Sequence, residues 1–271
     1  MDNRPIGVFD SGLGGLTAVK RLMDVLPHED IIYLGDTGRV PYGGRSKETI
    51  IKYARQDIAF LQQFDIKAIV VACGTVSTTA LDVIADDYTL PIFGVVEAAA
   101  HRAAQVTKNG KIGLIGTAAS IRSGAYTRQI QKLLPHAEVI GRACPLFVPL
   151  VENGRTAPGD VVIETVAREY LSPMQQAGVD TLILGCTHYP LLRDVIAGIM
   201  GPDITLVSSG DEAAGFVAGK LSADGQLNDK SAPGTYSYYV SDSTEDFAAL
   251  ASRFLEKDVE GHVAQISLDS F

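Results

Sequence analysis

Short apolar segments alternate with longer amphipathic ones along most of this 271-residue chain. Short apolar runs bounded by turn residues are typical of strands that are buried on both faces of a sheet. The runs predict seven strands, at Ile6–Phe9, Ile31–Leu34, Ala68–Ala72, Ile92–Val96, Ile112–Ile115, Thr181–Leu184 and Ile204–Val207. Because the strands alternate with helical segments, we predict an α/β fold with mainly parallel sheets flanked by helices.

The segment from Ser46 to Gln63 shows the helical pattern most clearly. Its apolar residues fall on one face of a helix, at Ile50, Ala54, Ile58 and Leu61. Ser46 is placed to cap the N-terminus of this helix, and Glu48 lies in its first turn.

Composition excludes several classes of protein. A formal net charge of −9, with no run of Lys or Arg, argues against a nucleic-acid surface. No secretory signal is visible, and apolar runs such as Ala68–Cys73 reach about a third of the roughly 20 residues that a membrane span needs. The three cysteines cannot all pair, which is typical of free thiols in a reducing compartment. We therefore expect a cytoplasmic protein without a nucleic-acid or membrane partner.

A faint internal repeat divides the chain into two similar parts. The segment 6-IGVFDSG-12 resembles 112-IGLIGTA-118, and each is followed by a strand that leads into a cysteine. Cys73 lies 63 residues after Asp10, and Cys186 lies 69 residues after Thr117. The repeat predicts two facing halves, each with one thiol at the carboxyl end of a strand, where open α/β sheets bind ligands.

Two glycine-containing loops are candidate ligand sites. The turn Asp10–Gly15 lacks the third glycine of a dinucleotide fingerprint and carries an acid, so it could hold a small anionic ligand against backbone N–H groups. It could equally be a structural turn in which Asp10 caps the next helix. The loop from Asp36 to Gly44 could hold a small polar substrate, or it could be an ordinary solvated loop.

The cysteines allow several interpretations. Cys144 precedes a proline and fits a buried core residue, whereas Cys73 and Cys186 lie beside Thr75 and Thr187. Cys186 and His188 form an isolated pair, and this argues against a metal site. A cysteine hydrolase with His188 as its base is a stronger rival. Residues two apart at a turn need not face each other, however, and a hydrolase leaves Cys73 without a role.

Five motifs, in order, resemble the glutamate racemase family within the aspartate/glutamate racemase superfamily. They are DSGLGG, YLGDTGRVPYGGRS, VVACGTVST, CPLFVPLVENG and LGCTHYP, and the match runs from Ile6 to about Ser209. The resemblance implies a cofactor-independent isomerase that supplies D-glutamate for peptidoglycan. We expect no metal in its site. It also implies two similar α/β domains, residues 1–97 with 209–271 and residues 98–208, with the site in the cleft between them. A homodimer is expected by the same analogy.

The resemblance also implies the site residues. Cys73 and Cys186 would be the two acid/base thiols, assisted by Asp10, Asp36, Glu152 and His188. The substrate would contact Asp10, Ser11, Pro41, Tyr42, Gly43, Gly74, Thr75, Ser120, Thr187 and His188.

Racemisation explains why two thiols are needed. One group removes the α-proton from one face, and another returns a proton to the opposite face. Carboxylates such as Asp10 and Glu152 would raise a thiol pKa, whereas a protonated His188 would lower that of Cys186. We expect the ammonium group of the substrate to offset the carboxylates when the cleft closes.

Two positions depart from the family pattern. Gly74 stands where the family usually has asparagine, and Ser120 stands where threonine is common. We expect water or the hydroxyl of Ser77 or Thr78 to replace the missing amide. The alternatives are another amino-acid racemase of the superfamily, such as aspartate racemase, a cysteine-dependent amidohydrolase, and a silent amino-acid-binding protein.

Overall fold

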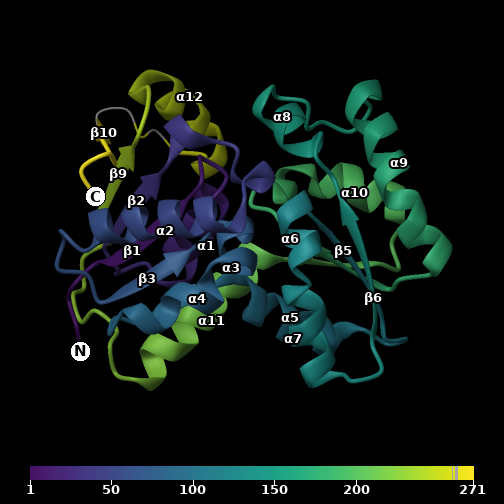
Figure 1. The fold of residues 1–271 in the computed structure, drawn as a ribbon, viewed down its shortest axis with the longest axis horizontal. Coiled ribbons are helices and arrows are strands. Elements are labelled where there is room, and N and C mark those ends of the chain that lie inside the picture. The colour runs from purple at the N-terminus through teal and green to yellow at the C-terminus, as the bar shows by residue number, and fades with distance from the viewer. Residues whose placement is uncertain (258, 260–261) are drawn as a thin grey trace.

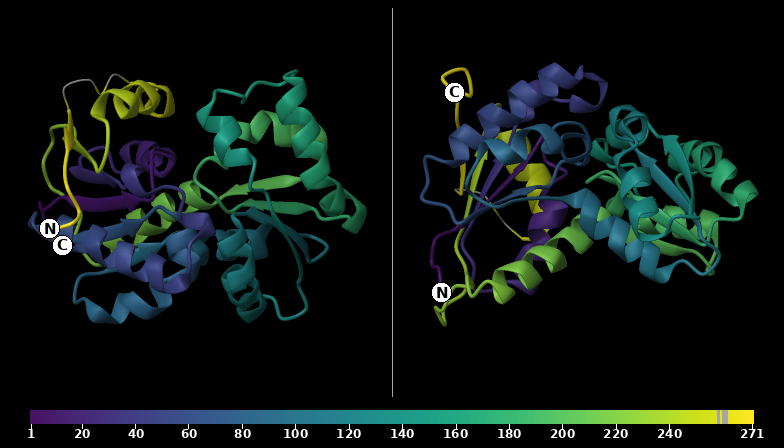
Figure 2. Two further views of the ribbon diagram at one scale, coloured as in Figure 1. Left: turned by 45° about the horizontal axis from the view of Figure 1, so that its top comes forward. Right: turned by 60° about the horizontal axis from the view of Figure 1, so that its bottom comes forward.

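Two parallel sheets, each covered by helices on both faces, make up the computed structural model, which describes residues 1–257, 259 and 262–271 (Figures 1 and 2). Every pair of neighbouring strands in the described residues runs parallel. The α/β fold predicted from the alternation of apolar and amphipathic segments is therefore confirmed.

The first sheet has the strand order β10-β9-β2-β1-β3-β4. Its strands are β1 (Ile6–Asp10), β2 (Ile31–Gly35), β3 (Ala68–Val71), β4 (Ile92–Gly94), β9 (Tyr236–Val240) and β10 (Val263–Gln265). Its α-helices are α1 (Leu16–Val25), α2 (Lys47–Leu61), α3 (Gly74–Thr79), α4 (Leu81–Ile84), α11 (Ser209–Ala223) and α12 (Thr244–Leu255). Short 3₁₀ helices are η1 (Thr37–Arg39), η2 (Tyr42–Gly44) and η3 (Ala85–Asp87). We call this sheet with these helices the first half.

The second sheet has the strand order β6-β5-β7-β8. Its strands are β5 (Lys111–Gly116), β6 (Glu138–Ala143), β7 (Thr181–Leu184) and β8 (Thr205–Ser208). Its helices are α5 (Val95–Val106), α6 (Ala118–Ser123), α7 (Ala125–Leu133), α8 (Phe147–Glu152), α9 (Val161–Ala177), η4 (Tyr189–Leu192) and α10 (Arg193–Met200). We call this sheet with these helices the second half.

Both halves repeat one topology. The order β2-β1-β3-β4 in the first half corresponds to β6-β5-β7-β8 in the second. In each half the central strand, β1 or β5, has its two chain successors on opposite sides, which creates a crevice at its carboxyl end. The repeat inferred from the sequence is therefore present, and residues that follow the carboxyl ends of β1, β3, β5 and β7 border one common cavity.

All seven predicted strands occur, although β4 ends at Gly94 and α5 begins at Val95. The helix predicted from Ser46 also occurs, and the Ser46 hydroxyl accepts a hydrogen bond from the Thr49 N–H (3.3 Å). The sequence did not predict β6, β9 and β10. They lie at or next to a sheet edge and are partly exposed, so they lack a continuous apolar run.

The chain returns to the first sheet near its C-terminus. β9 pairs with β2, and β10 pairs with β9 at the edge of the sheet (Figure 1). Among the described residues, no helix combines the length and apolar character that crossing a membrane requires.

A buried ion pair fastens the first half near the amino ends of its strands. Lys67 and Glu29 are almost fully buried, and the Lys67 ammonium lies 2.5 Å from the Glu29 carboxylate. The ammonium also donates to the backbone carbonyls of Asp2 (2.7 Å) and Gln226 (2.9 Å). Lys67 therefore connects the N-terminal segment, the entry to β3 and the segment that follows α11.

We expect Lys67→Met to destabilise the protein by about 3–5 kcal/mol, because it leaves the Glu29 carboxylate buried without a counter-charge. Urea denaturation followed by circular dichroism measures the loss. The double variant Lys67→Met/Glu29→Gln should recover part of it, since the uncompensated charge is then gone. A single variant as stable as the unmodified protein would show that the pair contributes nothing.

Candidate active site

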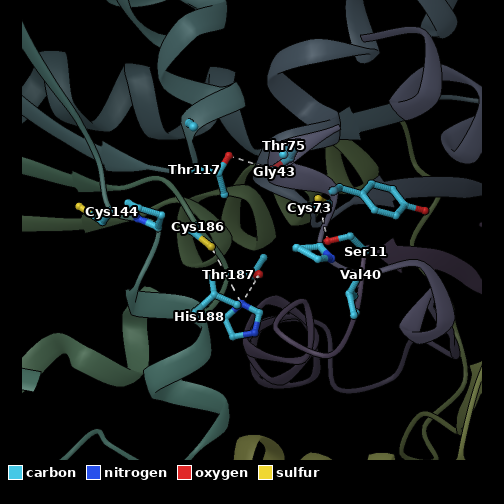
Figure 3. Close-up of a pocket in the computed structure, with 18 of the residues that line it drawn as sticks. Ser11, Val40, Gly43, Cys73, Thr75, Thr117, Cys144, Cys186, Thr187 and His188 are labelled. Atoms are coloured by element: carbon cyan, nitrogen blue, oxygen red, sulfur yellow. Dashed lines mark hydrogen bonds between the residues drawn. The ribbon is translucent and has the colours of Figure 1, made fainter. Parts of the chain in front are cut away.

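A cavity of about 490 Å³ lies between the two halves (Figure 3). The first half contributes the turn after β1, the loop 40–44 and the turn after β3, while the second contributes the turns after β5 and β7 and part of α8. Figure 3 shows Cys73 and Ser11 on one side of this space and Cys186, Thr187 and His188 on the other. The volume suits a small molecule.

Cys73 connects the end of β3 to the start of α3. Its side chain is only 3% exposed, and its thiol donates a hydrogen bond to the Ser11 hydroxyl (3.4 Å). Burial and the nearby Asp10 carboxylate raise the pKa of Cys73 to about 12. Cys73 therefore carries its proton at neutral pH in the ligand-free protein.

Cys186 follows β7 and has a different neighbour, the imidazole of His188. The Cys186 sulfur lies 3.9 Å from His188 Nδ1, and His188 Nε2 lies 3.1 Å from a Glu152 carboxylate oxygen. Burial alone would lower the pKa of His188, but Cys186, Glu152 and Asp10 outweigh it and raise the pKa to about 10. His188 is therefore an imidazolium at neutral pH. Although Cys186 and His188 are only two residues apart at a turn, their side chains face each other in the fold.

Asp10 lies beneath the glycine-containing turn and is nearly inaccessible to solvent. One carboxylate oxygen accepts hydrogen bonds from the N–H groups of Gly12 (3.2 Å) and Gly15 (3.0 Å). The other oxygen has no hydrogen-bond partner among the described residues. Burial raises the pKa of Asp10, and His188 opposes that rise. Asp10 thus holds the turn and also acts electrostatically on Cys73 and His188.

Asp36 lies behind the cavity and does not border it. It accepts hydrogen bonds from Arg39 (2.6 Å), from the Ser241 hydroxyl (2.7 Å) and from the Tyr42 hydroxyl. The Tyr42 hydroxyl also lies 3.2 Å from Asp57. Asp36 therefore fixes Tyr42 in the loop that does border the cavity, and the Tyr42 hydroxyl is occupied by carboxylates.

A chain of hydroxyl groups joins α3 to α6. The hydroxyl oxygens of Thr75 and Thr117 lie 3.0 Å apart, those of Thr117 and Ser120 3.0 Å apart, and those of Thr78 and Ser120 3.2 Å apart. Thr75 and Thr117 border the cavity, while Ser120 lies behind Thr117. Thr117 was missed by the sequence analysis. It occupies the position of Ser11 in the internal repeat, and that alignment could have identified it.

The other expected substrate-binding residues lie on the cavity wall: Ser11, Pro41, Gly43, Gly74 and Thr187. Ser77 and Thr78 do not border the cavity. Their hydroxyls donate hydrogen bonds to the backbone carbonyls of Val71 (3.0 Å) and Gly74 (2.8 Å). These two hydroxyls therefore do not stand in for the missing amide at position 74.

Cys144 differs from the other two cysteines. Its residue borders the cavity, yet its side chain is fully buried and its sulfur is turned away from Cys73 and Cys186 (Figure 3). The thiol lies 3.7 Å from the Arg142 carbonyl, and burial raises its pKa. This placement fits a core residue. Within residues 1–257, 259 and 262–271 no group of three His, Cys, Asp or Glu side chains is arranged to hold a metal.

Known proteins show the same sequence pattern and fold. Residues 17–217 match the profile of the family described as Asp/Glu/Hydantoin racemase. The chain belongs to this racemase family. A glutamate racemase from Geobacter metallireducens is 47% identical over 98% of both chains. A crystal structure of glutamate racemase from Francisella tularensis with D-glutamate covers 100% of both chains at 40% identity (TM-score 0.92). One from Bacillus anthracis covers 99% of both at 36% identity (TM-score 0.94).

Because the pKa of His188 is raised in the folded protein, the free energy of unfolding should depend on pH. In the unfolded chain its pKa is about 6.5, so the stabilisation from the buried imidazolium is fully present below that pH. It is lost as the pH rises through the folded-state value of about 10. The free energy of unfolding of the unmodified protein should exceed that of His188→Gln. We expect this difference to fall as the pH rises from about 6.5 to about 10.

Urea denaturation at a series of pH values between the two pKa values measures the fall. The limiting slope for one proton is about 1.4 kcal/mol per pH unit. In a Glu152→Gln background the same comparison should give a smaller fall, because one partner of the imidazolium is absent. A difference that does not change with pH would contradict a protonated His188.

Proposed function

We propose that this protein interconverts L- and D-glutamate without a cofactor, using Cys73 and Cys186 as its two acid/base groups. The observation that carries the proposal is the placement of two thiols on opposite sides of one cavity, each after the equivalent strand of a repeated topology (Figure 3). The glutamate racemases to which the chain is similar support the choice of substrate.

Two opposed thiols suit racemisation because the α-proton leaves from one face and a proton returns to the other. A substrate Cα held between the sulfurs would lose its proton to one thiolate and gain one from the other thiol, which leaves the resting protonation pattern reversed. After product release the two sulfurs exchange roles through solvent or through a turnover in the opposite direction.

The two thiols have different neighbours. Cys73, with a pKa raised to about 12, is a proton donor in the ligand-free state. The imidazolium of His188 can donate a hydrogen bond to a thiolate on Cys186. By the family resemblance Cys186 takes the proton from L-glutamate, so this pattern suits conversion of L- to D-glutamate.

The reverse reaction needs Cys73 as a thiolate. Asp10 raises the pKa of Cys73, so a bound cation must act against it. The substrate ammonium is such a cation, and it would lower the thiol pKa once it lies in the cavity. On the Cys186 side of the cavity, the Glu152 carboxylate holds the His188 ring in place. The hydroxyls of Ser11, Thr75 and Thr187 would hold the substrate, and Asp36 would act through Tyr42.

We also propose the cellular compartment, the assembly and the domain boundaries of the protein. We place the protein in the cytoplasm, as three free cysteines favour, with D-glutamate supplied to peptidoglycan and a homodimer as the assembly by family analogy. We assign residues 1–97 with 209–271 to one domain and 98–208 to the other. The membership of the strands in two separate sheets supports this division.

A cysteine hydrolase is the rival from another class. The 3.9 Å approach of Cys186 to His188 places a thiol beside an imidazole, the pair that a cysteine hydrolase uses, so geometry at this side alone fits both chemistries. Cys73 favours racemisation, because a hydrolase requires no second thiol on the opposite wall of the cavity.

Deuterium incorporation tests the two-base reaction. L-Glutamate incubated with the protein in D₂O should give D-glutamate that carries deuterium at Cα, while the remaining L-glutamate stays protiated early in the reaction. Chiral chromatography with mass spectrometry measures both pools. Label that enters both pools together would indicate a single base, and a hydrolase or a silent binding protein would label neither.

Cysteine variants test the assignment of the two groups. Cys73→Ala and Cys186→Ala should each lower kcat in both directions by at least about a thousandfold, because each turnover uses both thiols. Cys144→Ala is the matched control, and its kcat should stay within about twofold of the unmodified value because its sulfur faces away from the cavity. An essential Cys144 would overturn its placement in the core.

A further inference from the structure

A buried polar network behind the cavity contains one carboxyl group that the proposed reaction does not use. This group is Asp57 of α2, whose side chain is fully buried and does not border the cavity. One Asp57 oxygen accepts a hydrogen bond from Arg39 (3.1 Å), and the other lies 3.2 Å from the Tyr42 hydroxyl oxygen. Asp57 therefore connects α2 to the loop 40–44, which does border the cavity.

The network holds too few protons for two carboxylates. The Tyr42 hydroxyl contacts both Asp36 and Asp57, but it has one proton and can donate to only one of them. Asp36 is the better acceptor, because it also receives hydrogen bonds from Arg39 (2.6 Å) and from the Ser241 hydroxyl (2.7 Å). An ionised Asp57 would then face the Tyr42 oxygen with no proton between the two oxygens. A proton on Asp57 removes this conflict.

The charges of the network favour the same arrangement. Arg39 contacts both carboxyl groups, so a second carboxylate would add a buried negative charge without a cation of its own. Burial raises the pKa of Asp57, and the carboxylates of Asp36 and Asp10 also raise it, whereas Arg39 and Tyr42 act in the opposite direction. With the proton on Asp57, the remaining charges of Asp36 and Arg39 balance.

We propose that Asp57 is a positioning residue that works as a neutral carboxylic acid, donating its proton to the Tyr42 oxygen while Tyr42 donates to Asp36. These two hydrogen bonds fix the Tyr42 side chain and with it η2. The next residue, Gly43, lies on the cavity wall and directly against Thr117, since a Cβ atom added to Gly43 would lie 2.9 Å from Thr117 Cβ. A shift of Tyr42 would therefore move a part of the wall that contacts the substrate under the proposed racemase function, on which this inference rests.

Two substitutions of Asp57 distinguish a neutral donor from a carboxylate. Asp57→Asn keeps the shape of the side chain and offers an amide N–H to Tyr42 and an oxygen to Arg39. Its kcat and KM for both enantiomers should stay within about twofold of the unmodified values. Asp57→Leu has the same branching but no donor. Its KM should rise about tenfold, roughly the contribution of one hydrogen bond, with kcat little changed because the loop holds substrate and transition state alike.

Infrared spectroscopy detects the proton on Asp57 without any substrate. A protonated carboxyl group absorbs apart from carboxylates, so the difference spectrum between the unmodified protein and Asp57→Asn at neutral pH should contain a band of a protonated carboxyl. Asp86→Asn is the matched control. Asp86 is exposed in η3, and its difference spectrum should lack this band because exposed carboxyl groups are charged at neutral pH.

Three results would overturn the inference. A KM that rises as far in Asp57→Asn as in Asp57→Leu would show that Asp57 acts as an anion, and so would a difference spectrum without the band. An unchanged KM in Asp57→Leu would show that Asp57 does not position the loop. Should Asp57→Leu fail to fold, Asp57→Ala takes its place with the same expected rise in KM. If the unmodified protein does not racemise glutamate, the proposed function fails instead, and the infrared spectra alone decide whether Asp57 is a neutral acid.

Discussion

The site depends on the close approach of its two halves. Glycines at positions 14, 43 and 74 bring the turns of the first half against Thr187, Thr117 and Gly185 of the second half. Cys73, Cys186, Asp10 and His188 are all buried in this arrangement, so bulk solvent has little access to them. In a more exposed site, solvent would screen the charges that raise the pKa of Cys73 and of His188.

The two halves share one strand topology, but the surroundings of their thiols differ chemically. Equivalent strands carry Cys73 and Cys186, yet the first thiol faces a hydroxyl and a buried carboxylate while the second faces an imidazolium held by Glu152. The same scaffold therefore raises the pKa of one thiol and gives the other a cationic neighbour. A reaction that needs a proton donor and a proton acceptor at the same time benefits from that difference.

Contacts behind the cavity fix the groups that line it. Asp36 holds Tyr42, Asp10 holds the turn before α1, and Phe254 of α12 packs edge-on against His188 with ring centroids 6.1 Å apart. These residues connect the cavity to the core of the first half. Their substitution would move the lining residues even though Asp36 and Phe254 do not border the cavity.

The sequence alone determined the sheet strands with continuous apolar runs, the α2 helix cap, the repeat and the two thiols, because periodicity and turn residues are local properties. It missed β6, β9 and β10, whose partly exposed faces break the apolar pattern. Only the tertiary structure decided that Cys186 faces His188, that Asp36 lies behind Tyr42 and that Gly74 abuts Gly185. Those relations join residues through side-chain direction and the packing of two halves, and neither is encoded in the spacing of residues along the chain.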